Sequence, residues 1–130
     1  MGTANKSELS VIIKAKDLCS YVMTVTDKSP KRYRFTLVSR MQNYALDVIE
    51  DLYYANEVFV RAEDKEQAER RLAHQRKVQT SLKLLAYIAQ LAMEQQCILP
   101  KQYEQITRKV YDCQNLLGAW MKSDRKRFGL

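Results

Sequence analysis

Residues 100–123 read PKQYEQITRKVYDCQNLLGAWMKS and carry the clearest helical pattern in the chain. Apolar side chains return there at steps of three and four residues, which places them along one face of an α-helix. They are Tyr103, Ile106, Val110, Cys113, Leu117 and Trp120. Pro100 suits the first turn of a helix, where an N–H group has no helical partner to lose. The stretch therefore predicts a helix that buries one face in a core.

The same spacing recurs in three earlier segments, which we expect to form helices at about residues 7–27, 31–56 and 64–96, before the helix at about 100–123. Pro30 separates the first two, because proline lacks an N–H and disfavours the helical conformation in the residue before it. The acids Glu63 and Asp64 stand where the positive end of the third helix dipole favours them.

The third helical segment has a weak pattern in its first half. Gln75 and Gln79 fall where the spacing of the neighbouring apolar residues leads us to expect apolar side chains. We therefore expect this half to be solvated or used by a partner. Residues 124–130, DRKRFGL, also lack an apolar face, and we expect them to form a frayed basic tail.

Long helices joined by short links bury their apolar faces by lying antiparallel. The 130 residues have the length of one domain, and three Gly and two Pro leave few sites for the tight turns of a β fold. We therefore expect the all-α class, with a single domain over residues 1–130 that forms an antiparallel up-down-up-down four-helix bundle.

The cysteines and the start of the chain bear on the compartment. Cys19, Cys97 and Cys113 are odd in number and widely spaced, which predicts neither a disulfide framework nor a zinc site. The first six residues contain no apolar core of a signal peptide, and Lys6 stands where a myristoylation signal needs Ser or Thr. No apolar run approaches the roughly 20 residues that span a bilayer. We expect a soluble cytoplasmic protein without a membrane role.

Residues that could support catalysis are few. The single histidine, His74, reads as a solvated helical residue, and Asp47, Glu50 and Asp51 read as the outer face of a helix. No Glu-x-x-His pair is present for a metal site in a bundle, and the isolated glycines cannot form a phosphate loop. We expect no catalytic residues, no metal and no cofactor, and therefore not an enzyme.

The positive charge is the most informative feature for function. Lys and Arg number 22 against 15 Asp and Glu, a formal net charge of +7, with an isoelectric point near 9.4. Residues 28–46 and 70–93 contain no acid, and the C-terminus is again basic. In an antiparallel bundle the start of the third helix and the end of the fourth share one end. The candidate nucleic-acid-binding residues are Arg70, Arg71, Arg76, Lys77, Arg125, Lys126 and Arg127.

Such a patch has several possible partners. Phosphate backbones bind clustered cations by releasing counterions, which gives affinity without sequence selection. Acidic proteins compete for the same charge, whereas a membrane partner is disfavoured because no basic amphipathic helix carries exposed aromatic residues. The alternative is that the Lys and Arg side chains have no specific partner and only keep the helix surfaces hydrated. We expect RNA or DNA as the partner.

Two stretches resemble known proteins. Residues 29–35, SPKRYRF, resemble the Pro-Lys-x-x-Arg-Tyr pattern of small four-helix bundle proteins encoded in ribosomal-RNA intervening sequences. Residues 116–120, LLGAW, followed by DRK at 124–126, resemble the Leu-Gly-small-Trp ending of the Avd family, the accessory variability determinants of diversity-generating retroelements. The order of helices is similar over nearly the whole chain.

The resemblance implies a four-helix family fold, a pentameric barrel, and a basic surface that binds nucleic acid and the retroelement reverse transcriptase during mutagenic copying of RNA into DNA. It gives structural roles to Gly118, which would permit close helix approach, and to Trp120, which would fill the bundle end. We expect a homo-oligomer, with a pentamer favoured by the resemblance. Leu37, Tyr44 and Tyr53 flank the apolar face of the second helix and could serve neighbouring subunits.

We therefore expect a basic nucleic-acid-binding accessory protein that assists a reverse transcriptase. A helical adaptor that recognises protein alone is the alternative, and a bundle enzyme is a third. The neighbouring genes would discriminate between them, because a reverse transcriptase gene with paired template and variable repeats would favour the first.

Overall fold

The computed structural model describes residues 6–61 and 63–130. In these ranges the chain forms four long α-helices: α1 (Lys6–Thr26), α2 (Ser39–Glu57), α3 (Lys65–Glu94) and α4 (Pro100–Phe128). The start of the chain, for which the sequence predicts no signal peptide, lies outside the described residues. None of the described helices is long and apolar enough to cross a membrane.

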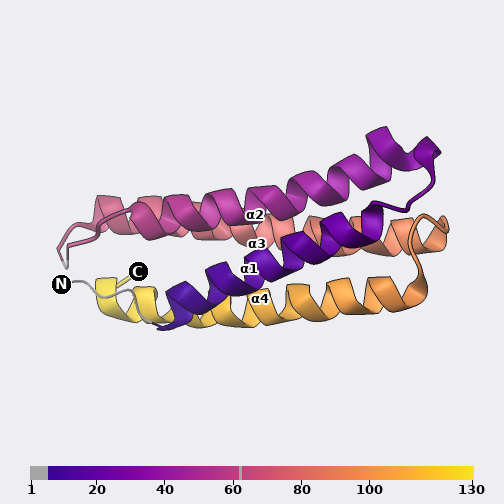
Figure 1. The fold of residues 1–130 in the computed structure, drawn as a ribbon. Helices are drawn as coiled ribbons and strands as arrows, with labels where there is room; N and C mark the ends of the chain where they lie inside the picture. The colour runs from indigo at the N-terminus through magenta and orange to yellow at the C-terminus, as the bar shows by residue number, and fades with distance from the viewer. Residues whose placement is uncertain (1–5, 62) are drawn as a thin grey trace.

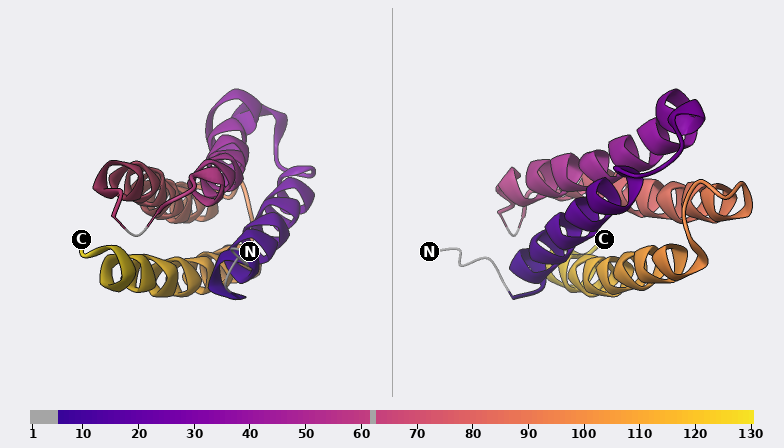
Figure 2. Two further views of the ribbon diagram at one scale, coloured as in Figure 1. Left: turned by 90° about the vertical axis from the view of Figure 1, so that its left-hand side faces the viewer. Right: turned by 45° about the vertical axis from the view of Figure 1, so that its right-hand side comes forward.

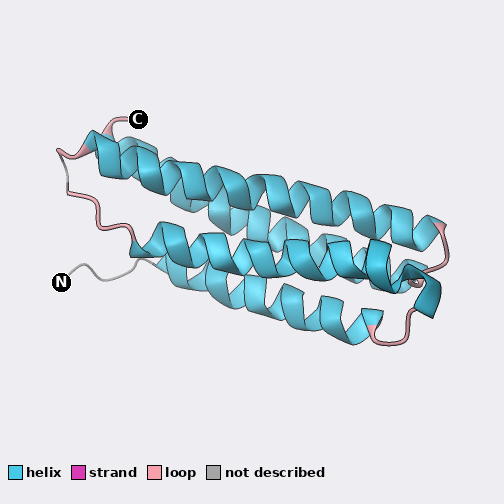
Figure 3. Cartoon of the chain, turned by 90° about the horizontal axis from the view of Figure 1, so that it is seen from above, coloured by secondary structure: helices cyan, strands magenta, loops and turns pink. Residues whose placement is uncertain are grey.

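The helices form an antiparallel up-and-down bundle, as the spacing of apolar residues predicts. Each helix packs against the next in the chain, and α1 packs against α4 to close the bundle. In Figure 1, α1 runs obliquely across the front between α2 and α4, while α3 lies behind α2. The end-on view in Figure 2 separates the four helices around a common interior, and Figure 3 shows their length relative to the short connections.

One apolar core runs through the bundle, and the residues at three- and four-residue spacing supply it. Leu18, Val48, Leu85 and Leu117 represent the four helices in it, and each is fully buried. Trp120 is also fully buried, which confirms the expectation that it fills the interior near one end. Burial of this apolar surface is the main stabilising contribution to such a bundle.

The helix starts follow the local sequence signals. Asp64 caps α3, because its side chain accepts a hydrogen bond of 3.1 Å from the backbone N–H of Gln67. Pro100 opens α4 as predicted, and the side chain of Gln102 accepts a bond of 2.8 Å from the backbone N–H of Leu99. These contacts satisfy N–H groups that have no partner inside the helix.

The helix predicted at about residues 31–56 begins irregularly. A 3₁₀ helix, Lys31–Tyr33, and a π-helix, Arg34–Val38, precede the regular turns of α2. The hydroxyl of Tyr33 donates a hydrogen bond of 3.0 Å to the carbonyl of Gln95. Ser29 makes a similar bond of 2.9 Å to the carbonyl of Cys97. These two bonds join the connection before α2 to the connection between α3 and α4.

The prediction of a frayed tail after residue 123 is wrong. Helix α4 continues to Phe128, and the side chains of Asp124 and Phe128 are buried. Gly129 then ends the helix in the left-handed conformation, with φ of 68°, and its N–H bonds the carbonyl of Arg125. Glycine adopts this conformation without steric cost, so a Gly after a basic last turn is a helix-end signal.

Three further expectations about packing are wrong. Gln75 of α3 is buried and faces the interior of the bundle rather than solvent. Gly118 is exposed, and a Cβ atom added there would meet nothing within 4 Å among the described residues, so none of the described helices approaches it closely. Leu37 and Tyr44 pack against the core of their own chain, which leaves Tyr53 as the exposed member of the three residues suggested for subunit contacts.

Candidate nucleic-acid interface

Three of the four cations proposed on the start of α3 face solvent. Arg70, Arg76 and Lys77 are exposed, whereas Arg71 is buried with an exposed fraction of 9%. The expectation that Arg71 lies on a solvated face is therefore wrong. The charge pattern does not show this difference in burial. Two successive arginines in a helix point to different faces, so one can be exposed while the other is buried.

Arg71 lies inside the bundle with a carboxylate partner. Its Nη1 is 3.3 Å from Oδ1 of Asp124, and its Nη2 donates a bond of 2.8 Å to the carbonyl of Val58. Gln75 donates a second side-chain bond, of 3.0 Å, to Oδ2 of Asp124. The guanidinium also lies 5.8 Å from the centre of the Trp120 ring, within range of a cation–π interaction. These contacts make Arg71 a structural residue.

The end of α4 lies beside the start of α3, as an antiparallel bundle requires. Arg76 lines a hollow of about 430 Å³ together with Gly129 and Leu130. Helix α4 keeps Arg125, Lys126 and Arg127 exposed in its last turn. Figure 1 shows the C-terminus and the start of α3 at the same end of the bundle.

We call these six exposed cations the basic end: Arg70, Arg76, Lys77, Arg125, Lys126 and Arg127. Acids lie beside these cations, since Glu66 and Glu69 are exposed in the first turns of α3 and Glu69 lines the same hollow as Arg76. From Arg70 to Met93, however, α3 carries no acid. The basic end therefore has positive charge from two helices, and its Arg127 also lies 3.5 Å from the buried carboxylate of Asp124.

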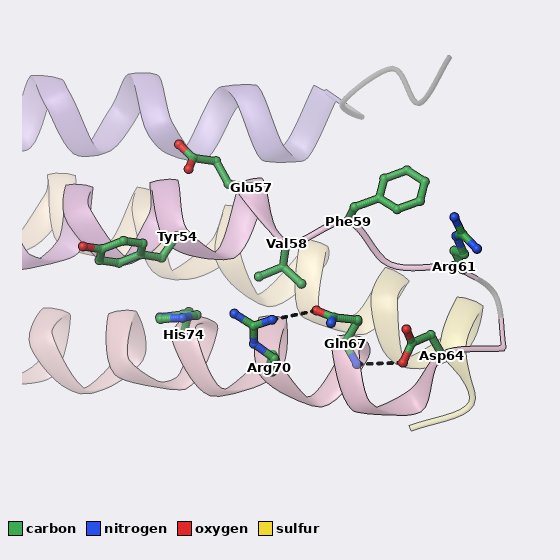
Figure 4. A pocket seen from close by; sticks show the side chains of 9 residues that line it. All are labelled: Tyr54, Glu57, Val58, Phe59, Arg61, Asp64, Gln67, Arg70 and His74. Atoms are coloured by element: carbon green, nitrogen blue, oxygen red, sulfur yellow. Dashed lines mark hydrogen bonds between the residues drawn. The ribbon is translucent and has the colours of Figure 1, made fainter.

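A pocket that the sequence did not predict opens next to the basic end, between the end of α2 and the start of α3. It has a volume of about 460 Å³, and Figure 4 shows the side chains that surround it. Its lining residues are Tyr54, Glu57, Val58, Phe59, Arg61, Asp64, Gln67, Arg70 and His74. These residues come from α2, the following loop and α3, so no single stretch of sequence reveals the pocket.

His74 is held in this pocket, contrary to its interpretation as a solvated residue. Its Nδ1 lies 3.2 Å from Oδ1 of Asp51, and its ring centre lies 5.3 Å from that of Tyr54. A carboxylate only accepts hydrogen bonds, so Nδ1 carries the proton in this pair. Asp51 consequently faces α3 rather than lying on the outer face of α2.

The three cysteines are buried, free thiols that pack in the interior. Burial raises the pKa of the Cys113 thiol from 9.0 to about 12, and the negative charges of Asp112 and Asp17 add to the shift. Burial also raises the pKa of Cys19. A thiol is a nucleophile only when it is ionised, so neither cysteine is activated at neutral pH.

The described part of the chain contains no group of three or more His, Cys, Asp or Glu side chains arranged to hold a metal ion. Its exposed groups include the cations of the basic end, and the pocket adds aromatic, amide and carboxylate side chains. This set of groups can bind phosphates by charge and planar rings by stacking.

Comparison with known proteins identifies the family. A search of curated proteins gives no significant match. Residues 10–124 match the sequence profile described as bAvd-like, and this range runs from α1 to the turn of α4 that contains Asp124. The match agrees with the resemblance of residues 116–120 to the Avd ending. The chain therefore belongs to the bAvd-like family.

Proposed function

We propose that this protein is a nucleic-acid-binding accessory subunit of a retroelement reverse transcriptase. It acts by binding and carries out no chemistry of its own. Membership of the bAvd-like family supports the accessory role, and the charge distribution supports the nucleic-acid partner.

The basic end is the observation that carries the nucleic-acid part of the proposal. Six exposed cations on two neighbouring helix segments give a positive surface that needs no sequence motif to attract a polyanion. Each phosphate that a cation neutralises releases condensed counterions, which makes binding favourable at low salt. RNA and DNA share this backbone chemistry, so we expect both to bind with little sequence preference.

Charge reversal at the basic end tests the proposal. We expect the triple variant Arg70→Glu, Arg76→Glu and Lys77→Glu to lose binding to duplex DNA and structured RNA at about 50 mM salt, as measured by gel shift. Arg71 stays unchanged, because a glutamate there would face the buried carboxylate of Asp124. The helical circular dichroism spectrum should remain that of the wild type, since all three changed residues are exposed.

A second triple variant supplies the matched control. Lys28, Lys31 and Arg34 are exposed at the opposite end of the bundle, and their change to Glu alters the net charge by the same amount. If only the first variant loses binding, the basic end is the interface. If the wild type gives no gel shift, or if the first variant binds as well as the wild type, the protein is better explained as an adaptor for a protein partner.

The reverse transcriptase partnership needs its own test. Where a reverse transcriptase gene lies beside this one, the enzyme should co-purify with the tagged protein after nuclease treatment, because the family role implies a direct protein contact. Loss of the enzyme after nuclease treatment would mean that nucleic acid alone bridges the two. The absence of such a gene would favour the adaptor function.

We also propose that the chain assembles with copies of itself, with a pentamer favoured by the family resemblance. Exposed apolar side chains on different helices, such as Ile13, Leu46 and Tyr111, support an assembly. A ring would repeat the basic end and bind a long polyanion with avidity. Sedimentation at micromolar concentration should show a particle larger than the 15.2 kDa chain, and a monomer would contradict the proposal.

A further inference from the structure

We propose that the pocket between the end of α2 and the start of α3 binds a single unpaired nucleotide of a nucleic-acid strand. The base stacks on Tyr54, and the adjoining phosphate contacts Arg70. The inference rests on the proposed function and extends it, because it assigns single-stranded nucleic acid to a specific site beside the basic end.

The aromatic part of the site is already ordered. Tyr54 is half exposed, at 50%, and the centre of its ring lies 5.3 Å from that of the His74 ring, at an angle of 31°. His74 is held in turn by its contact of 3.2 Å with Asp51. A base placed on Tyr54 would extend this pair into a three-ring stack, and such stacking tolerates any base because every base has a π face.

Arg70 supplies the charge that the phosphate needs. Arg70 and His74 are four residues apart on α3 and therefore lie on one face, and Figure 4 shows the Arg70 guanidinium beside the His74 ring. One N–H of Arg70 donates a bond of 3.1 Å to Oε1 of Gln67, which orients the guanidinium at the pocket wall. Arg61, in the loop after α2, is exposed and lines the end of the pocket away from Tyr54 in Figure 4, where it adds positive charge.

The two acids at the pocket do not cancel this charge. Asp64 is engaged as the cap of α3, where it accepts the bond of 3.1 Å from the backbone of Gln67. In Figure 4 the carboxylate of Glu57 points away from His74 and Arg70. On the side of the pocket that carries Tyr54, His74 and Arg70, the facing acid is Asp51, and its carboxylate contacts Nδ1 of His74 at 3.2 Å.

The size of the pocket suits one small ligand such as a single nucleotide. Its volume of about 460 Å³ falls within the range of about 300–1,000 Å³ that holds a single small ligand. In a duplex the faces of the bases are covered by their neighbours, so a protein aromatic ring stacks on bases only where a strand is single. Duplex binding at the basic end needs charge alone, and the two modes can therefore be separated by substitution.

The experiment compares Tyr54→Ala with Tyr54→Phe and Tyr87→Ala in the full-length protein. Tyr87 is exposed to a similar extent, 58%, on α3 but does not line the pocket. Affinity is measured by fluorescence anisotropy for a labelled oligo(dT) and for a duplex of the same length. Thermal unfolding of each variant confirms that the bundle is intact.

We expect Tyr54→Ala to bind oligo(dT) about tenfold more weakly, as the loss of one stacked base implies, with duplex affinity unchanged. Tyr54→Phe and Tyr87→Ala should bind both probes like the wild type. If Tyr54→Ala retains oligo(dT) affinity, or loses affinity for both probes equally, the inference fails while the proposed function stands. If the wild type binds neither probe, the proposed function fails and the inference fails with it.

Discussion

Asp124 of α4 holds the side chain of Arg71 of α3 inside the bundle, with Nη1 of the arginine 3.3 Å from Oδ1 of the carboxylate. Both residues are buried, and Arg71 also bonds the carbonyl of Val58 in the connection after α2. Three parts of the chain therefore meet at one ion pair. The pair fixes the last turns of α4 against α3 and so positions the cations of the basic end.

Removal of Asp124 should destabilise the fold strongly. Asp124→Ala leaves the charge of Arg71 buried without its carboxylate, and breaking a buried pair in this way costs about 3–5 kcal/mol. The free energy of unfolding is measured by urea denaturation. The neighbouring change Lys126→Ala is the control, since that side chain is exposed and should cost less than about 0.5 kcal/mol. Equal stabilities of the two variants would show that the pair has no structural role.

Leu117 tests the core directly. Its side chain is fully buried, and Leu117→Ala should lower the free energy of unfolding by about 2–5 kcal/mol, because it removes buried apolar atoms and leaves a cavity. Chemical denaturation followed by circular dichroism measures the change. A loss below about 0.5 kcal/mol would place this face of α4 outside the core.

The neighbouring residue should behave in the opposite way. Gly118 is an exposed residue within α4, and a Cβ added to it would meet no packed neighbour within 4 Å in the part of the chain that the structure describes. Gly118→Ala should therefore raise the free energy of unfolding by about 0.5–1 kcal/mol, since alanine loses less conformational entropy in a helix. Thermal unfolding provides the measurement. A lower melting temperature would mean that a neighbouring copy approaches this position closely in the assembly.

The raised pKa of Cys113 predicts a loss of stability in alkali. In the unfolded chain the thiol ionises above its usual pKa of 9.0, whereas in the native state its pKa is about 12. Between these values the native state binds more protons, so this contribution is present below pH 9 and falls as the pH rises. Because Cys113→Ala lacks the group, the stability of the wild type relative to this variant should be about 1 kcal/mol lower at about pH 10 than at about pH 8. An identical difference at both pH values would contradict the assignment.

The sequence predicts the helices well because burial repeats with the helical period. Leu117 and Trp120 stand at that spacing, and both are fully buried. Arg71 and Asp124 are buried too, but charged residues do not register in an apolar pattern. The apolar pattern therefore does not predict that α4 continues to Phe128. Gly129 after a basic turn is the available sign of this helix end.

In the candidate nucleic-acid interface, the sequence predicts the exposed cations, because charged side chains usually lie on the surface, but it does not predict the pocket. Arg70, Arg76 and Lys77 lie on the surface, as charged helix residues usually do. The pocket depends on Tyr54 meeting His74, which is 20 positions away in the sequence, and this contact is set by the packing of α2 against α3. Residue types alone do not specify such a juxtaposition.

The salt dependence of duplex binding tests the central claim that the basic end neutralises phosphates. If all six of its cations contact the backbone, the slope of log K against log salt for duplex DNA should be about −5. The variant Arg70→Gln, Arg76→Gln and Lys77→Gln should reduce that slope in magnitude by about 3, because it removes three contacts. A slope near zero, or the same slope in the wild type and the variant, would contradict this account of how the protein binds nucleic acid.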